Sequence, residues 1–303
     1  MKECTLVIVN PFAGSGRAFR AWSKLEPMLI DAFGDLVVAI TRHPEEIVEH
    51  LDKAYAAGLT RVIAVGGDGT AFTVMNAVLE FQKTLPPGQE ILFGQLPMGT
   101  GQDFGRHLGI PRDPALAIQW LVNARPKPLD LGCLEFDGRQ RRFLNVASVG
   151  MGGEIDKRVN RMTVRRPWTF WVETVRAFLT YTPPWVSVRL DGDLWYEGRA
   201  WIVAVANASS FGRGMLIAPD ARIDDGLLDV VLVQDMPRLT AIKAFNSVYS
   251  GKHLLRDDVR HQRASTIEIQ GADGPLPIDL DGEYTDGQNL RFFVQPGALR
   301  MLA

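Results

Sequence analysis

Residues 61–70 read RVIAVGGDGT, in which a β-branched apolar run passes directly into a glycine-rich turn. The residues that follow, Ala71–Phe81, have a helix-like composition. A short apolar strand that breaks into glycines and re-enters a helix is typical of a parallel α/β sheet, whose strands are buried on both faces. Residues 61–81 therefore predict one strand–loop–helix unit of such a sheet.

Similar units surround this one in the first third of the chain. Three further strand-like runs precede turns or helices: Thr5–Val9, Leu36–Ile40 and Ile91–Leu96. The stretch at 125–128, which contains two prolines, is the best candidate for a linker. We therefore predict a parallel α/β domain over residues 1–128, onto which the C-terminal tail at 295–303 can pack back.

The pattern changes after Asp130. Strand-like runs now dominate, and turns such as Asp137-Gly138 separate them. The runs lie at residues 143–149, 185–190, 199–206, 227–233, 266–270 and 290–294. Helix-like segments interrupt them at 165–179 and 240–249. We predict an antiparallel β-sandwich domain over residues 129–294.

Composition narrows the class of protein. The 303 residues are 46% apolar and 22% charged with a formal net charge of −2, which is ordinary for a globular protein and argues against a basic nucleic-acid binder. Cys4 and Cys133 form neither a disulfide framework nor a CxxC metal site. No apolar run approaches the ~18 residues that cross a bilayer. We expect a cytoplasmic protein with no nucleic-acid partner and only peripheral membrane contact.

Three glycine-rich loops follow three of the predicted strands, at residues 10–17, 66–70 and 96–103. In an open parallel sheet all three lie at the carboxyl edge, where ligands bind. Glycine lets backbone N–H groups approach an anion, and a helix N-terminus adds positive potential. Any one loop is equally consistent with a plain turn, but the three together favour a polyphosphate site. Four polar side chains stand where phosphate or Mg²⁺ would bind: Asp68, Thr70, Thr100 and Asp103.

Longer blocks of the sequence carry a family resemblance. In chain order they are NP at 10–11, GGDGT at 66–70, LPMGTGQDFGR at 96–106, DDGLLD at 224–229, DGE at 281–283 and PGALR at 296–300. They resemble the signatures of the diacylglycerol kinase catalytic-domain family, bacterial lipid kinases related to sphingosine and ceramide kinases. The resemblance implies an N-terminal domain like those of NAD kinase and phosphofructokinase. It also implies Mg²⁺-dependent transfer of the ATP γ-phosphate to a lipid hydroxyl, with diacylglycerol as the expected acceptor and phosphatidic acid as the product.

The resemblance further implies roles for single residues. ATP contacts are implied for Asn10, Thr41, Gly66, Gly67, Asp68, Gly69, Thr70, Gly99 and Thr100. Asp68 and Asp103 would organise the phosphates and Mg²⁺, and Asp130 would reach the catalytic metal through water. Glu283 would be the general base on the lipid hydroxyl, with Asp281 beside it.

A structural cation is implied as well. Asp225, with the backbone carbonyls of Arg222 and Leu227, resembles a Mg²⁺ site, and Mg²⁺ prefers oxygen ligands. Taken alone, the DGE run at 281–283 predicts only a hairpin turn. Beside the other blocks, we expect a turn that also presents Glu283.

Two departures from the family pattern bear on the nucleotide. The family often has Leu-Asn-Glu after GGDGT, where this chain has Ala71-Phe72-Thr73, and Gln102 replaces the asparagine of the NDF block. The first departure argues against an NAD kinase, in which the Asn-Glu pair helps to hold the dinucleotide. We expect altered nucleotide contacts, with the aspartates retained.

A basic and aromatic segment, residues 157–178, is a candidate for peripheral membrane contact. Its members are the cations Lys157, Arg158, Arg161, Arg165, Arg166 and Arg176, the single acid Glu173, and the aromatic residues Trp168, Phe170, Trp171 and Phe178. Cations beside tryptophans suit a helix lying on anionic lipid. The alternative is a solvated basic face over a buried aromatic core.

Other functions stay open at this point. The acceptor lipid could be a sphingoid base, ceramide or another lipid alcohol. The chain could also be a catalytically silent regulator that binds a nucleotide or a lipid, although the retained Asp68, Asp103 and Glu283 argue against that. Family members are often dimers, so a homodimer is a further expectation.

Overall fold

The computed structural model describes residues 4–160 and 169–303. It divides into two compact units. Unit 1 comprises Met1–Leu129 and Gly297–Ala303, and unit 2 comprises Asp130–Pro296. The C-terminal residues therefore return to the unit in which the chain begins.

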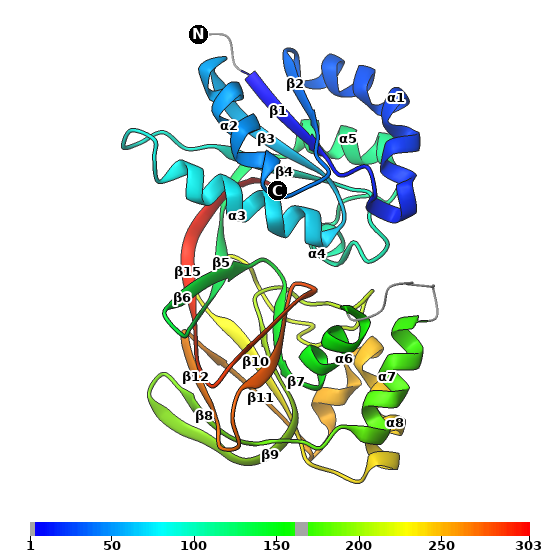
Figure 1. Cartoon of the computed structure of the whole chain (residues 1–303), viewed down its shortest axis with the longest axis vertical. Coiled ribbons are helices and arrows are strands. Elements are labelled where there is room, and N and C mark those ends of the chain that lie inside the picture. Colours follow the sequence, from blue (N-terminus) through cyan, green and yellow to red (C-terminus); the bar gives the residue numbers. More distant parts are fainter. Residues whose placement is uncertain (1–3, 161–168) are drawn as a thin grey trace. The chain divides into compact units, whose positions relative to one another are not determined.

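Unit 1 contains a parallel sheet, as its apolar runs predict. Its strands are β1 (Cys4–Val9), β2 (Leu36–Ile40), β3 (Leu59–Gly66) and β4 (Leu92–Pro97). They lie in the order β2-β1-β3-β4 and all pair in parallel (Figure 1). The end of β15 (Asn289–Leu302) joins β4, where Met301 pairs with Phe93.

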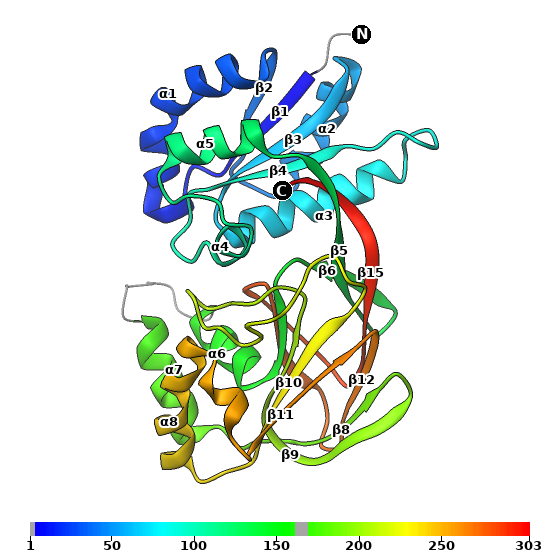
Figure 2. The same cartoon turned by 180° about the vertical axis from the view of Figure 1, so that it is seen from behind.

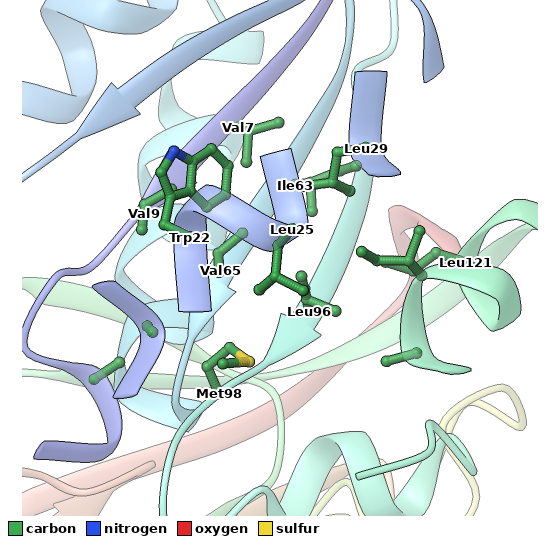
Figure 3. Packing of buried hydrophobic residues seen from close by; sticks show 14 of the residues in the cluster. Val7, Val9, Trp22, Leu25, Leu29, Ile63, Val65, Leu96, Met98 and Leu121 are labelled. Atoms are coloured by element: carbon green, nitrogen blue, oxygen red, sulfur yellow. The ribbon is translucent and has the colours of Figure 1, made fainter. Parts of the chain in front are cut away.

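Helices cover both faces of this sheet. They are α1 (Ala13–Phe33), α2 (Glu46–Ala56), α3 (Asp68–Gln82), α4 (Asp103–His107) and α5 (Pro114–Asn123). One face carries α1 and α5, and the other carries α2 and α3 (Figure 2). Trp22, Leu25 and Leu29 of α1 pack against alternate strand residues such as Val7 and Ile63 (Figure 3). Both faces of β1 and β3 are thereby buried, which explains their continuous apolar sequence.

Unit 2 is built on antiparallel strands, which confirms the predicted fold class. They are β5 (Pro126–Phe136), β6 (Arg139–Phe143), β7 (Val146–Gly150), β8 (Trp185–Leu190), β9 (Asp193–Ala206), β10 (Leu228–Gln234), β11 (Val259–Ala264), β12 (Thr266–Gly271), β13 (Leu276–Leu280) and β14 (Glu283–Gly287), with β15 beside β12. The first half of β9 pairs with β8, and its second half pairs with β7 and β10. This long strand therefore belongs to two sheets.

The α-helices among the described residues of unit 2 are α6 (Met151–Asn160), α7 (Thr169–Thr180) and α8 (Arg238–Phe245). The predicted helix at 240–249 ends early, because after Phe245 the chain tightens into 3₁₀ turns at Asn246–Ser250 and Lys252–Leu255. The predicted strand at 143–149 is two strands, interrupted at Leu144 and Asn145. None of the helices in the described ranges has the length and apolar character needed to span a membrane.

Candidate active site

The loops that follow β1, β3 and β4 are joined at the carboxyl edge of the unit 1 sheet. Asn10, after β1, donates its side-chain N–H to the Thr70 hydroxyl at the start of α3, over 2.9 Å. The same amide accepts the Phe12 N–H through its oxygen at 3.0 Å. Met98, after β4, donates its backbone N–H to the Gly66 carbonyl at 2.7 Å. The structure thus brings together the three loops that the sequence placed at one edge.

Glycine is required where the second and third loops meet. A Cβ added to Gly99 would lie 2.4 Å from the Cα of Gly67, and one added to Gly66 would lie 2.4 Å from the Thr70 hydroxyl oxygen. Real Cβ atoms do not approach other atoms so closely, so both loops need bare backbone here. Gly69 and Thr70 are half-buried and Thr100 is exposed. Helix α3 begins at this edge, and the first N–H groups of a helix lack intrahelical partners and suit an anion.

The first loop adds a fixed positive charge. Residues Gly14, Ser15 and Gly16 interrupt α1 near its start and are all left-handed, with φ of 59°, 59° and 79°. This tight turn directs Arg17 to the third loop, where its guanidinium donates to the Gly99 carbonyl at 2.7 Å. Arg17 ends the loop predicted at residues 10–17 but was given no role there, although a cation directly after a Gly-Ser-Gly turn is a signal for one.

Asp68 connects the starts of two helices. It lies in the first turn of α3, and its carboxylate accepts the backbone N–H groups of Asp103 at 3.0 Å and Phe104 at 3.3 Å, at the start of α4. Burial raises the pKa of Asp68, and these hydrogen bonds oppose that shift. Asp103 is itself buried and pairs with Arg106 at 2.6 Å. Both aspartates thus help to fix the loop geometry.

Thr41 and the departures from the family pattern also have defined places. Thr41 is buried after β2, where its N–H donates to the Val9 carbonyl at 3.0 Å. Ala71 and Phe72 are buried in α3, and the Thr73 hydroxyl donates to the Gly69 carbonyl at 2.9 Å. The three altered positions therefore serve helix packing.

Gln102 makes hydrogen bonds within the third loop. Its backbone is left-handed, with φ of 56°, and its side-chain N–H groups donate to the carbonyls of Pro97 and Gly99, each at 3.1 Å. These bonds close the loop on itself. The longer side chain thus stabilises the turn in front of α4.

In unit 2, a tight turn joins β13 to β14 and precedes Glu283. Asp281 and Gly282 have φ of 52° and 93°, as an Asp-Gly hairpin turn requires. The Asp281 carboxylate accepts three backbone N–H groups, from Leu144 at 2.6 Å, Asn145 at 2.9 Å and Val146 at 3.1 Å. Burial raises the pKa of Asp281 to about 7, against the effect of these bonds. They also explain the interruption between β6 and β7.

Glu283 itself is exposed at the first position of β14, opposite Leu280. An exposed carboxylate on a firmly held turn is accessible to a substrate hydroxyl. The turn therefore has the two properties that a positioned base needs, a fixed backbone and an open side chain.

Asp130 is tied to the loop before β10. Its carboxylate accepts the Gly226 N–H at 2.7 Å, and its own N–H donates to the Ile223 carbonyl at 2.8 Å. The Asn207 side chain donates to the carbonyls of Asp130 at 3.0 Å and Leu144 at 2.9 Å. Asn207, which our sequence analysis missed, thus connects Asp130 to the segment that Asp281 holds.

Two models of known protein families match this chain. Residues 5–134 match the model of the diacylglycerol kinase catalytic domain, and residues 145–303 match the YegS C-terminal NAD kinase beta sandwich-like domain. The chain belongs to the diacylglycerol kinase-like family of lipid kinases.

Relatives of this lipid kinase cover nearly its whole length. It is 30% identical to a "Probable lipid kinase YegS-like" of Pseudomonas aeruginosa PAO1, over 89% of this chain and 85% of the relative. It is 27% identical to a diacylglycerol kinase of Mycobacterium tuberculosis H37Rv, over 97% and 93%. A crystal structure of a diacylglycerol kinase from Bacillus anthracis str. Sterne matches with a TM-score of 0.72 at 26% identity, covering 98% of this chain and 96% of that one.

An arginine, Arg263, pairs with Asp225, the aspartate that was expected to hold a structural Mg²⁺ in this lipid kinase. Asp225 accepts the Leu227 N–H at 3.1 Å through one carboxylate oxygen and pairs with Arg263 through the other. The Arg263 guanidinium also lies 3.6 Å from the Asp229 carboxylate. Within residues 4–160 and 169–303, no group of three or more His, Cys, Asp or Glu side chains is arranged to hold a metal ion. Arg263 thus supplies Asp225 with a positive charge, and the structural Mg²⁺ site formed by Asp225 and the carbonyls of Arg222 and Leu227 stays a prediction.

The basic segment of the lipid kinase is described only in part. Arg161, Arg165, Arg166, Trp168 and the side chains of Phe170 and Trp171 lie outside the described residues. Within the described part, Arg158 pairs with Glu154 at 2.8 Å and Arg176 with Glu173 at 2.9 Å. Phe178 is buried, as the alternative of an aromatic core predicts for it. The membrane role of this segment stays a prediction.

Proposed function

We propose that this chain transfers the γ-phosphate of MgATP to a lipid hydroxyl, with diacylglycerol as the acceptor and phosphatidic acid as the product. The observation that carries the proposal is the joining of the three glycine-rich loops at one sheet edge of unit 1. Membership of a lipid kinase family supports a phosphoryl acceptor of this class.

The loops are suited to hold the triphosphate. Backbone N–H groups at the start of α3 and the guanidinium of Arg17 offer positive potential to the phosphates, which bring their own Mg²⁺. Phosphoryl transfer depends mainly on positioning and charge neutralisation. Asp68 and Asp103 contribute by fixing the loops, and we expect Asn10, Thr41 and Thr100 to border the nucleotide.

Glu283 is the proposed general base. As the acceptor oxygen forms its bond to the γ-phosphorus, its proton passes to the Glu283 carboxylate and the bond from phosphorus to the β–γ bridging oxygen breaks, releasing MgADP. The exposure of Glu283 on the turn that Asp281 holds supports this role. We expect the lipid to be presented by a membrane surface that the protein contacts peripherally, through residues 157–178.

The altered residues 71–73 do not favour a silent regulator. Ala71 and Phe72 are buried and the Thr73 hydroxyl bonds within its helix, so their identity is explained by packing. The retained carboxylates and loops argue for catalysis. The acceptor could still be a sphingoid base or ceramide, because the exposed carboxylate suits any lipid alcohol.

Transfer of labelled γ-phosphate to lipids in mixed micelles tests the proposal. The reaction contains Mg²⁺ and a panel of diacylglycerol, monoacylglycerol, sphingosine and ceramide, with Glu283→Gln as the blank. We expect labelled phosphatidic acid that is lost in the blank. Labelling of another lipid instead would replace diacylglycerol as the acceptor. No labelled lipid, despite measurable ATP binding, would contradict the kinase activity.

A further inference from the structure

A second, buried carboxyl group lies behind the turn that carries Glu283. Asp279 is in β13, with 7% of its surface exposed, and its carboxylate accepts the N–H of Gly282 at 2.6 Å. Gly282 is the residue directly before Glu283. The hydrogen bond therefore fixes the backbone from which the proposed base projects.

Asp279 has an acidic partner on a neighbouring helix. Helix α6 packs on β13, β14 and β7, and it places the Asp156 carboxyl group near Asp279. Two carboxylates that are close together and shielded from water repel each other, so the protonated form of one of them is favoured. A proton between the two groups would remove this repulsion.

Two glycines let α6 come close enough for this pairing. A Cβ on Gly153 would lie 2.3 Å from the backbone nitrogen of Ile278, and a Cβ on Gly152 would lie 1.9 Å from the Ser148 hydroxyl oxygen. The backbone of α6 therefore lies directly on β13 and β7. The Gly-Gly pair at the start of α6 brings Asp156 to Asp279.

We propose that Asp279 is a positioning residue for Glu283, and that Asp279 and Asp156 share one proton while the turn holds Glu283 in place. This inference rests on the proposed role of Glu283 as the base. It assigns a function to a carboxyl pair formed by residues far apart in the sequence.

The charged groups around the pair are consistent with this role. On α6, Glu154 is paired with Arg158, and Lys157 lies 5.6 Å from the Tyr284 ring centre of β14. Ser148 of β7 is directly opposite Asp279, and the carboxylates of Asp281 and Glu283 are near in the turn. The nearby charges of Asp156 and Glu283 are thus both negative.

These surroundings determine how the stability of the turn, and with it kcat, should depend on pH. Burial raises the pKa of Asp279 well above its ordinary value, and the charge of Asp156 adds to the rise. A carboxyl group with a raised pKa stabilises the fold at low pH, and this contribution is lost as pH increases through the raised value. We therefore expect the turn to loosen, and kcat to fall, as pH rises and the shared proton leaves.

Three variants test the proposal. Asp279→Asn keeps an oxygen for the Gly282 N–H and donates an N–H to Asp156 without a titrating proton. It should retain kcat within about threefold at the pH where the wild type is most active, and its kcat should no longer fall as pH rises. Asp279→Ala removes the acceptor and should lower kcat about tenfold or more with the KM for ATP unchanged. Ser148→Ala, at the buried position opposite, should change neither kcat nor its pH profile.

Two kinetic results would overturn the proposal. One is Asp279→Asn losing as much kcat as Asp279→Ala. The other is Asp279→Asn keeping the pH profile of the wild type.

A readout without catalysis separates this inference from the proposed function. The infrared difference spectrum between wild type and Asp279→Asn should show the carbonyl stretch of one protonated carboxyl group in the wild type, and this band should disappear as pH rises. Over the same pH range, hydrogen exchange of Gly282 should accelerate beyond the ordinary base-catalysed increase. If no lipid is phosphorylated, the proposed function fails while the spectrum still tests the shared proton. Absence of the band would overturn the inference even in an active enzyme.

Discussion

The glycine-rich loops of unit 1 and the Glu283 turn of unit 2 are held in place by different kinds of contact. The loops depend on bare backbone: Gly67 and Gly99 touch, and neutral amide and hydroxyl groups such as Asn10 and Thr70 connect the rest. The turn depends on buried carboxyl groups, because Asp279 and Asp281 together accept four backbone N–H bonds. Steric changes should therefore damage the first region, and loss of charge or of hydrogen bonds should damage the second.

Removing the Asp281 carboxylate should have the largest effect on stability. Asp281→Ala leaves three buried N–H groups without their acceptor, so we expect the free energy of unfolding to fall by about 3 kcal/mol or more, measured by urea denaturation. The control is Asp137→Ala, in an exposed Asp-Gly turn with a similar φ of 49°. It should cost only about 1 kcal/mol, the backbone penalty of Ala at positive φ. Equal losses would mean that the carboxylate bonds contribute nothing.

Adding one methyl group at Gly99 should push apart the second and third loops of unit 1. Gly99→Ala forces its Cβ against the Gly67 backbone, so the loops must separate and ATP affinity should fall about 100-fold, measured by calorimetry. Gly88→Ala is the control, because nothing lies within 4 Å of the added atom and the residue is outside the three loops. Unchanged affinity in Gly99→Ala would show that this contact does not shape the nucleotide site.

In a third region, the loop before β10, a single ion pair between Asp225 and Arg263 replaces both kinds of contact. Because Arg263 is 40% exposed, Arg263→Met should lower the free energy of unfolding by only about 1 kcal/mol. Removal of divalent ions with EDTA should leave the melting temperature of the wild type unchanged. A clear drop in melting temperature would show that a metal ion, and not Arg263, neutralises Asp225.

The strand–loop–helix units of unit 1 were predictable because β-branched runs and glycine turns are local signals. The meeting of the loops at one edge followed from parallel topology alone. The contacts that hold the turn were not predictable, since Asp156 and Asp279 are distant in sequence and the periodicity of α6 is obscured by Gly152 and Gly153. Arg263 was missed for a similar reason: it lies across a strand pair from Asp229, and only the register of β10 and β11 reveals it.

Glu283→Gln most directly tests the proposal that the loops of unit 1 bind ATP while Glu283 accepts the proton of the acceptor hydroxyl. Calorimetry with MgATP and transfer of labelled γ-phosphate to diacylglycerol are measured on the same preparation. We expect ATP affinity within about twofold of the wild type and transfer reduced by about 100-fold or more, because only the proton acceptor is lost. Transfer near the wild-type rate would contradict the assignment of Glu283 as the base.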